Sequence, residues 1–158
     1  MIFIFGYLFS MGMDVILIIL SGILGTMVMT VFSHILEKVS GHKFNEAHLL
    51  NKLIDRCGTF DSNAEDNDIR GWAIHLAIGI LMAMGLYFYI NYAKEFSVLI
   101  SGVVLGFFLG IIGVLGWTIM FKKHSDPPEI NLVYFFVQLI CAHMIFGVSA
   151  LWILTKIG

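Results

Sequence analysis

The fold is decided by residues 96–121, which read FSVLISGVVLGFFLGIIGVLGWTIMF and contain no charged side chain. A stretch of this length can cross the hydrocarbon core of a bilayer, about 30 Å thick, as one α-helix. The backbone must satisfy its own hydrogen bonds there, and a helix does so. We therefore predict a transmembrane helix over 96–121.

Three further apolar stretches have a similar length and lie at about 13–36, 71–92 and 130–155. Each is long enough to span a membrane. The composition agrees, because the 158 residues are 59% hydrophobic and 13% charged, with a mean hydropathy of +0.92, outside the range of soluble domains. The sequence predicts an all-α integral membrane protein, a four-helix bundle forming a single transmembrane domain over residues 1–158.

Two features between the spans predict local structure. A short amphipathic helix is expected over residues 46–57, with Asn45 as its N-cap and Gly58 as its stop, and such a helix is expected to lie on the membrane surface. The turn from Asp126 to Glu129 predicts a capped start for the last span, with Asp126 accepting hydrogen bonds from the first amides.

Positive charges predict the orientation. Lys38, Lys43, Lys52, Arg56, Arg70, Lys122 and Lys123 lie between spans one and two or three and four, whereas Lys94 and Lys156 lie on the opposite side. The positive-inside rule then puts both connections in the cytoplasm and both termini outside. We expect a multi-pass protein of the inner (plasma) membrane whose main partner is the lipid bilayer. The net charge of −2 offers no basic field for nucleic acid.

Two pairs of matching motifs indicate an internal repeat. The first and third spans share a G-x4-T motif that ends at Thr30 and Thr118, and the second and fourth share an H-x3-G motif that begins at His75 and His143. Because each unit contains two spans, the copies would enter the membrane in the same direction. We predict two tandem helical hairpins in a parallel repeat, with the histidines as symmetry mates.

Small residues occupy one face of two spans. These faces consist of Gly22, Thr26, Thr30 and Ser33 in the first span and of Gly102, Gly106, Gly110 and Gly113 in the third. Close backbone approach supplies much of the association energy between helices in lipid. The faces predict either central helix packing or a contact between copies, and we expect a homo-oligomer or a membrane partner.

Ionisable side chains inside a bilayer are costly and usually face an interior, which makes His75 and His143 the first site candidates. Gln138, Thr30 and Thr118 add polar groups within the spans. Together they predict an interior site that binds or transports an ion, proton or small ligand, because imidazole can donate, accept and relay protons. In the structural alternative, the histidines only hold the helices together.

Two other functions stay open. His75 and His143 could supply opposed axial ligands to one haem b, which is sound chemistry inside a four-helix bundle. Alternatively, the cytoplasmic rim carries His34, Glu37 and His124 as candidate zinc or iron ligands of a metal-dependent membrane enzyme. The sequence contains no HExxH motif and no dense histidine boxes.

Two sets of motifs carry resemblances. Glycine-bearing helices that alternate with histidine-bearing ones are similar, at the level of spacing, to the membrane cytochromes b. An L-G-T…M-T segment at residues 24–30 and an A-H-x3-G segment at residues 142–147 resemble those of small bacterial inner-membrane proteins of uncharacterised function. The second resemblance implies a four-helix fold and a membrane location and brings no activity.

Overall fold

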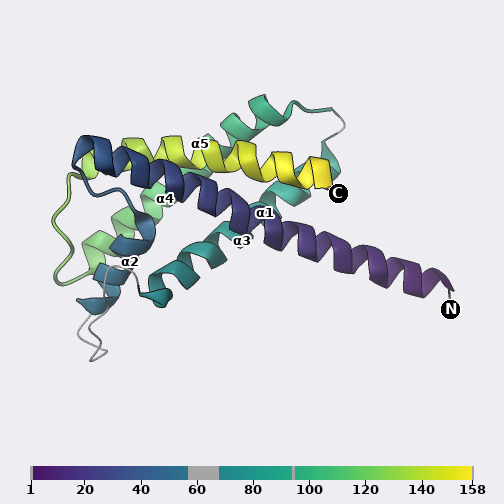
Figure 1. The fold of residues 1–158 in the computed structure, drawn as a ribbon, viewed down its shortest axis with the longest axis horizontal. Helices are drawn as coiled ribbons and strands as arrows, with labels where there is room; N and C mark the ends of the chain where they lie inside the picture. Colours follow the sequence, from purple (N-terminus) through teal and green to yellow (C-terminus); the bar gives the residue numbers. More distant parts are fainter. Residues whose placement is uncertain (1, 57–67, 94, 158) are drawn as a thin grey trace.

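Figure 1 shows the computed structural model of the protein, which is all-helical. The structure describes residues 2–56, 68–93 and 95–157, with side chains from Gly12 to Lys156 in these ranges. They contain five helices and no strand: α1 (Ile2–Ser40), α2 (Glu46–Asp55), α3 (Ile69–Tyr92), α4 (Val98–Lys123) and α5 (Leu132–Ile157). All except α2 are long and apolar enough to cross a membrane. The prediction of an all-α membrane protein is confirmed.

The helix ends differ in part from the predicted ones. α1 begins at Ile2, well before residue 13, and its N-terminal part projects beyond the other helices (Figure 1). The predicted cap of α2 is confirmed, since Asn45 Oδ1 accepts a hydrogen bond of 3.2 Å from the His48 N–H. α2 ends at Asp55, and its predicted stop at Gly58 lies outside the described residues.

The predicted cap of α5 at Asp126 is wrong, although the helix begins at Leu132, close to the predicted residue 130. Asn131 Oδ1 accepts a hydrogen bond of 3.2 Å from the Tyr134 N–H, so the first turn is capped five residues later. The Asp126 carboxylate instead lies 3.5 Å from the Arg56 guanidinium. An ion pair to the segment after α2 therefore holds the side chain that the sequence suggested as a cap.

The long helices pack in the order α3 on α1, α1 on α5 and α5 on α4. The small-residue faces make these contacts close. A Cβ added at Gly22 of α1 would lie 2.6 Å from Ile80 Cα of α3, and one added at Gly106 of α4 would lie 2.6 Å from Met144 Cα of α5. Both faces are therefore used for packing inside the chain.

α2 packs against protein, which differs from the membrane-surface position predicted for it. Its residues Leu49, Leu50 and Leu53 are buried in a cluster with Trp117 of α4 and Phe135 of α5. α2 is also tied to the start of α3, because its Asn51 side chain accepts from the Gly71 N–H at 2.7 Å and donates to the Asp68 carbonyl at 2.8 Å. The amphipathic pattern was right, but the apolar face covers other helices.

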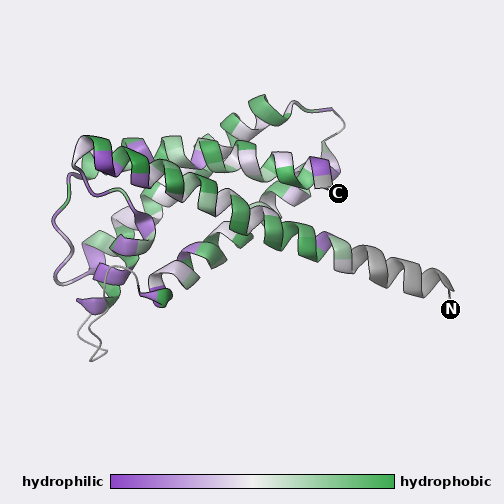
Figure 2. Ribbon diagram, viewed as in Figure 1, coloured by the Kyte–Doolittle hydropathy of each residue, from purple (hydrophilic) through white to green (hydrophobic). Residues whose placement is uncertain are grey.

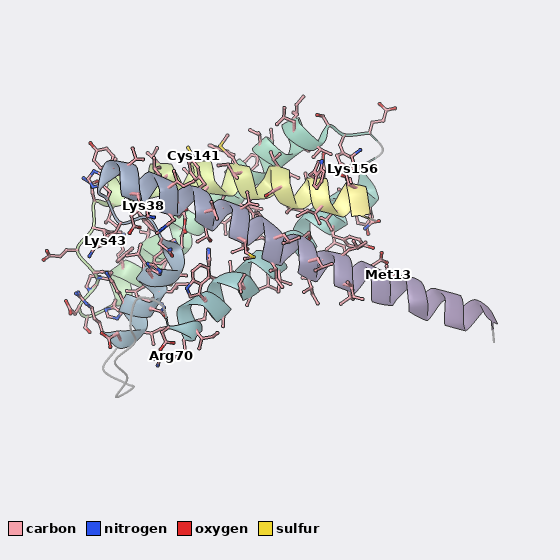
Figure 3. The ribbon with its side chains drawn as sticks, in the orientation of Figure 1. Met13, Lys38, Lys43, Arg70, Cys141 and Lys156 are labelled. Carbon is pink, nitrogen blue, oxygen red and sulfur yellow. The ribbon has the colours of Figure 1, made fainter. Side chains whose placement is uncertain are left out.

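The two ends of the molecule differ in charge. Figure 2 shows mostly hydrophobic long helices, with hydrophilic residues gathered around α2. Lys38, Lys43 and Arg70 lie at the end that contains α2, and Lys156 lies near the opposite end (Figure 3). Lys94 lies outside the described residues. Between the ends the helices expose large hydrophobic side chains such as Val31, Leu81 and Leu115, which suits contact with lipid.

Candidate functional site

A cavity of about 220 Å³ lies inside the helical fold and collects polar groups from four helices. Its wall includes Thr26 of α1, Glu46 of α2, His75 of α3 and His143 of α5. The rest of the lining is mainly apolar and contains three methionines, Met29, Met82 and Met120. Three ionisable side chains that are far apart in sequence thus share one cavity.

The cavity reaches the molecular surface between α3 and α4. Ile78 of α3 and Ile112 of α4 both line it and are 39% and 58% exposed. In the described part of the chain, α3 and α4 have no extended packing interface with each other. A seam between these helices therefore connects the cavity with the apolar side of the molecule.

His75 is 6% exposed and is oriented by a hydrogen-bond chain along α1. The Thr26 hydroxyl donates to the Gly22 carbonyl at 2.7 Å, and the Thr30 hydroxyl donates to the Thr26 carbonyl at 2.8 Å. Because the Thr30 proton is used there, His75 Nε2–H must be the donor in its 3.1 Å contact with Thr30 Oγ1. In neutral His75 the lone pair therefore sits on Nδ1, which has no hydrogen-bond partner among the described residues.

His143 is 4% exposed and has the opposite tautomer. Its Nδ1 lies 2.8 Å from the Leu139 carbonyl, which can only accept, so Nδ1 carries the proton. The lone pair of the neutral ring is then on Nε2. A Cβ added at Gly113 of α4 would lie 3.4 Å from this nitrogen, so the glycine leaves space for the ring. The two imidazoles each present one lone pair in the wall of the same cavity.

Glu46 is the acidic member of the site and is only 1% exposed. Its Oε1 accepts from the Ser33 hydroxyl at 3.0 Å, and Gln138 Nε2 donates to Ser33 Oγ at 2.6 Å. Its Oε2 has no hydrogen-bond partner within the described residues. Burial raises the pKa of Glu46 from 4.5 to about 7, although hydrogen bonds from its own backbone, Ser33 and Gln138 act in the opposite direction.

The structure brings together four of the five predicted site residues. His75 and His143 line the cavity, Thr30 holds His75, and Gln138 belongs to the hydrogen-bonded group around Glu46. Thr118 lies apart from them. It lines a different hollow near the start of α5, and its hydroxyl donates to the carbonyl one turn earlier in α4.

Glu46 and the three methionines were not predicted as members of the interior site. A signal was present, because Leu49, Leu50 and Leu53 follow it by three, four and seven residues, which places Glu46 on the apolar face of α2. A carboxyl on an apolar face is a candidate for burial.

The proposed metal ligands at the rim are engaged elsewhere or exposed. His34 is exposed, and the Glu37 carboxylate accepts two backbone N–H groups before α2, at 2.8 and 3.0 Å. His124 contacts the Leu53 carbonyl through Nε2 at 2.9 Å and the Asp126 N–H through Nδ1 at 3.1 Å. Within the described ranges, no group of three or more His, Cys, Asp or Glu residues could hold a metal ion. The rim metal site gains no support.

The haem hypothesis also gains no support from the cavity. Pockets for drug-sized ligands measure about 300–1,000 Å³, and a haem is larger than most such ligands, whereas this cavity measures about 220 Å³. His75 Nε2 is also engaged with Thr30. Haem ligation through Nε2 would require that bond to break and the helices to separate.

One known family matches the chain. The model described as "Family of unknown function (DUF6789)" matches residues 13–155, which is most of the chain. The chain belongs to this family. The match includes every described residue that lines the cavity, so the candidate site lies within the DUF6789 region. No curated protein and no solved structure matches the chain.

Proposed function

We propose that this protein binds or transports a small ligand, ion or proton at an interior membrane site that contains His75 and His143. The supporting observation is the cavity of about 220 Å³ on which both histidines and Glu46 converge. Ionisable groups within membrane proteins are expensive to bury and commonly mark substrate or proton pathways. The small volume favours a ligand of only a few heavy atoms.

We also propose that the site is formed by two tandem hairpins, α1–α3 and α4–α5, in a four-helix bundle. Gly22 closely approaches Ile80, and Gly102 closely approaches Val148. Ile80 and Val148 each follow the histidine of their helix by five residues. If Gly22 and Gly102 are equivalent positions of the two hairpins, the repeat has an offset of 80 residues (102 minus 22). The G-x4-T motif, which matches Thr30 with Thr118, gives an offset of 88 residues (118 minus 30). The helix contacts therefore support a repeat in a different register.

The distribution of charge supports an orientation with α2 in the cytoplasm and both termini outside. Lys38, Lys43 and Arg70 lie at the end with α2 (Figure 3), as the positive-inside rule requires of a cytoplasmic face. We propose the inner membrane as the location and a homo-oligomer as the assembly. Because the small-residue faces are used inside the chain, the copies would meet through another surface.

The experiment that tests the function obstructs the cavity at its open side. Gly116 lines the cavity and is exposed, and a Cβ added there would have no atom within 4 Å, so Gly116→Leu places a side chain at the opening without a backbone clash. Gly85 of α3 also has open space and is not part of the lining, which makes Gly85→Leu the matched control. Both variants are purified in a nonionic detergent and reconstituted in liposomes.

Three probes of similar size but different charge are titrated calorimetrically: n-butylammonium, n-butanol and butyrate. A trapped pH dye reports proton flux in the liposomes. We expect at least one probe to bind, or protons to pass, in the wild type and Gly85→Leu, with a loss in Gly116→Leu. The proposal is wrong if the wild type shows neither binding nor flux, or if Gly116→Leu leaves both unchanged.

A further inference from the structure

The polar groups in the cavity wall offer mainly acceptors. The hydroxyl proton of Thr26 is used for the Gly22 carbonyl, so Thr26 can only accept from a ligand. Neutral His75 and His143 present lone pairs, because their ring protons bind Thr30 and the Leu139 carbonyl. The unpartnered Oε2 of Glu46 is a further acceptor whenever the carboxyl is ionised.

Donors are scarce by comparison. Among the described lining residues, the indole N–H of Trp117 and the proton of un-ionised Glu46 are the side-chain donors left for a ligand. The remaining wall is apolar or consists of thioethers, which are polarisable and weak acceptors. Such a wall suits a short hydrocarbon that ends in a group rich in N–H donors.

We propose that the ligand is a small primary amine, bound as its ammonium ion between His75, His143 and Glu46 with its hydrocarbon among the methionines. This inference rests on the proposed function and names the class of its ligand. An ammonium group has three donors and no acceptor, so it can satisfy the free acceptors of the wall. A carboxylate of the same size would place acceptors against acceptors.

The anchors of His75 and Glu46 lie close together along α1. Thr30 holds His75, and Ser33 holds Glu46. These two anchors are three residues apart, which corresponds to a rise of about 4.5 Å along the helix. The two anchored side chains therefore lie at neighbouring levels of the cavity wall, less than one helical turn apart.

Charge balance is the second part of the proposal. An ammonium ion in a membrane interior needs a counter-charge, and Glu46 is the one acidic side chain of the described lining. The titratable groups around Glu46 are Glu37 of α1 and the cavity residues His75 and His143. The charge of Glu37 raises the pKa of Glu46. The described residues of α4 that line the cavity include no titratable side chain. Since the pKa of Glu46 is about 7, its carboxyl is mostly protonated at pH 6.

Binding at pH 6 then exchanges one cation for another. The ammonium ion enters, the O–H bond of the Glu46 carboxyl breaks, and the proton leaves to solution. The product is an ammonium–carboxylate pair, and the net charge of the cavity does not change. An uptake of amine coupled to proton release would let a pH gradient drive amine movement in either direction.

The test titrates n-butylammonium into the detergent-solubilised protein at pH 6 with a dilute pH indicator. We expect about one proton released per amine bound, and affinity at least about tenfold above that of n-butanol, as a charge-assisted hydrogen bond predicts. Glu46→Gln should abolish the proton release and weaken amine binding at least about tenfold. Glu129 is an exposed carboxyl outside the cavity, so Glu129→Gln should behave as the wild type.

The alternative outcomes separate this inference from the proposed function. Equal or tighter binding of n-butanol or butyrate would refute the amine but keep the cavity as a small-ligand site. Binding of Ag⁺ that excludes butylammonium and persists in Glu46→Gln would assign the site to a soft metal ion held by methionine and histidine. Amine binding without proton release would refute the exchange. If no probe binds and no proton flux is seen, the proposed function fails as well.

Discussion

The buried Glu46 should make the stability of this protein decrease as the pH rises. The carboxyl has a pKa of about 7 in the folded protein and 4.5 when unperturbed, so between these values the folded state holds a proton that the unfolded state has lost. Stability falls wherever the folded state binds more protons. The contribution of protonated Glu46 is therefore complete below pH 4.5, declines through the window and is lost above pH 7.

The magnitude follows from the difference of about 2.5 pKa units. At 1.36 kcal/mol per unit, ionisation of Glu46 should cost about 3 kcal/mol across the window. For a chain of this size, that loss corresponds to a decrease of about 6–12 °C in Tm. Thermal unfolding in a nonionic detergent, followed by circular dichroism from pH 4.5 to 8, measures the decrease.

The matched variant is Glu46→Gln, which keeps the shape of the side chain and does not titrate. All other titrating groups are shared, so the difference between the two pH profiles belongs to Glu46. We expect the variant to have a flatter profile and to exceed the wild type above pH 7. Parallel profiles would mean that Glu46 is solvated and ionised in the folded protein, and the reasoning from its burial would be refuted.

Three further substitutions test the packing and the histidines. Gly106→Ala forces α4 and α5 apart by about 1 Å, because the new Cβ would lie 2.6 Å from Met144 Cα. In thermal unfolding, this substitution should cost about 1–3 kcal/mol of stability. The control Gly116→Ala, which has open space around its Cβ, should be neutral or stabilising. Thr30→Val removes the hydrogen-bond partner of buried His75 and should cost about 1–3 kcal/mol of stability. Thr30→Ser keeps the hydroxyl and should retain most of the wild-type stability in the same assay. Replacing His75 and His143 together by Ala should reduce probe binding or proton flux in liposomes more than it lowers Tm. A loss of stability with unchanged binding would show that the pair only holds helices together.

The membrane fold could be predicted because the signal is strong and local. A long run without charge, such as residues 96–121, has few stable conformations apart from a membrane helix. The glycine and threonine faces also led to the correct contact surfaces, since their spacing fixes which residues share a helix face. The partners of these faces, on α3 and α5, could not be read from the spacing.

The candidate site was predicted only in part because its members meet through tertiary packing. His75 and His143 stood out since imidazoles within apolar runs are rare. Glu46 did not, because its environment depends on where α2 docks. Thr118 was included through the G-x4-T motif, whose copies end 88 residues apart (118 minus 30), whereas the closely packed Gly22 and Gly102 are 80 residues apart (102 minus 22). Short motifs of common residues cannot determine a helix register without the facing helix.

The seam between α3 and α4 has a consequence for the membrane around the protein. Because Ile78 and Ile112 are exposed on its two sides, we expect acyl chains to complete the wall of the cavity in a bilayer. A ligand would then compete with a lipid tail for this space, and its affinity would depend on the order and saturation of the surrounding lipids. The bilayer would then be part of the wall of the binding site as well as the solvent of the protein.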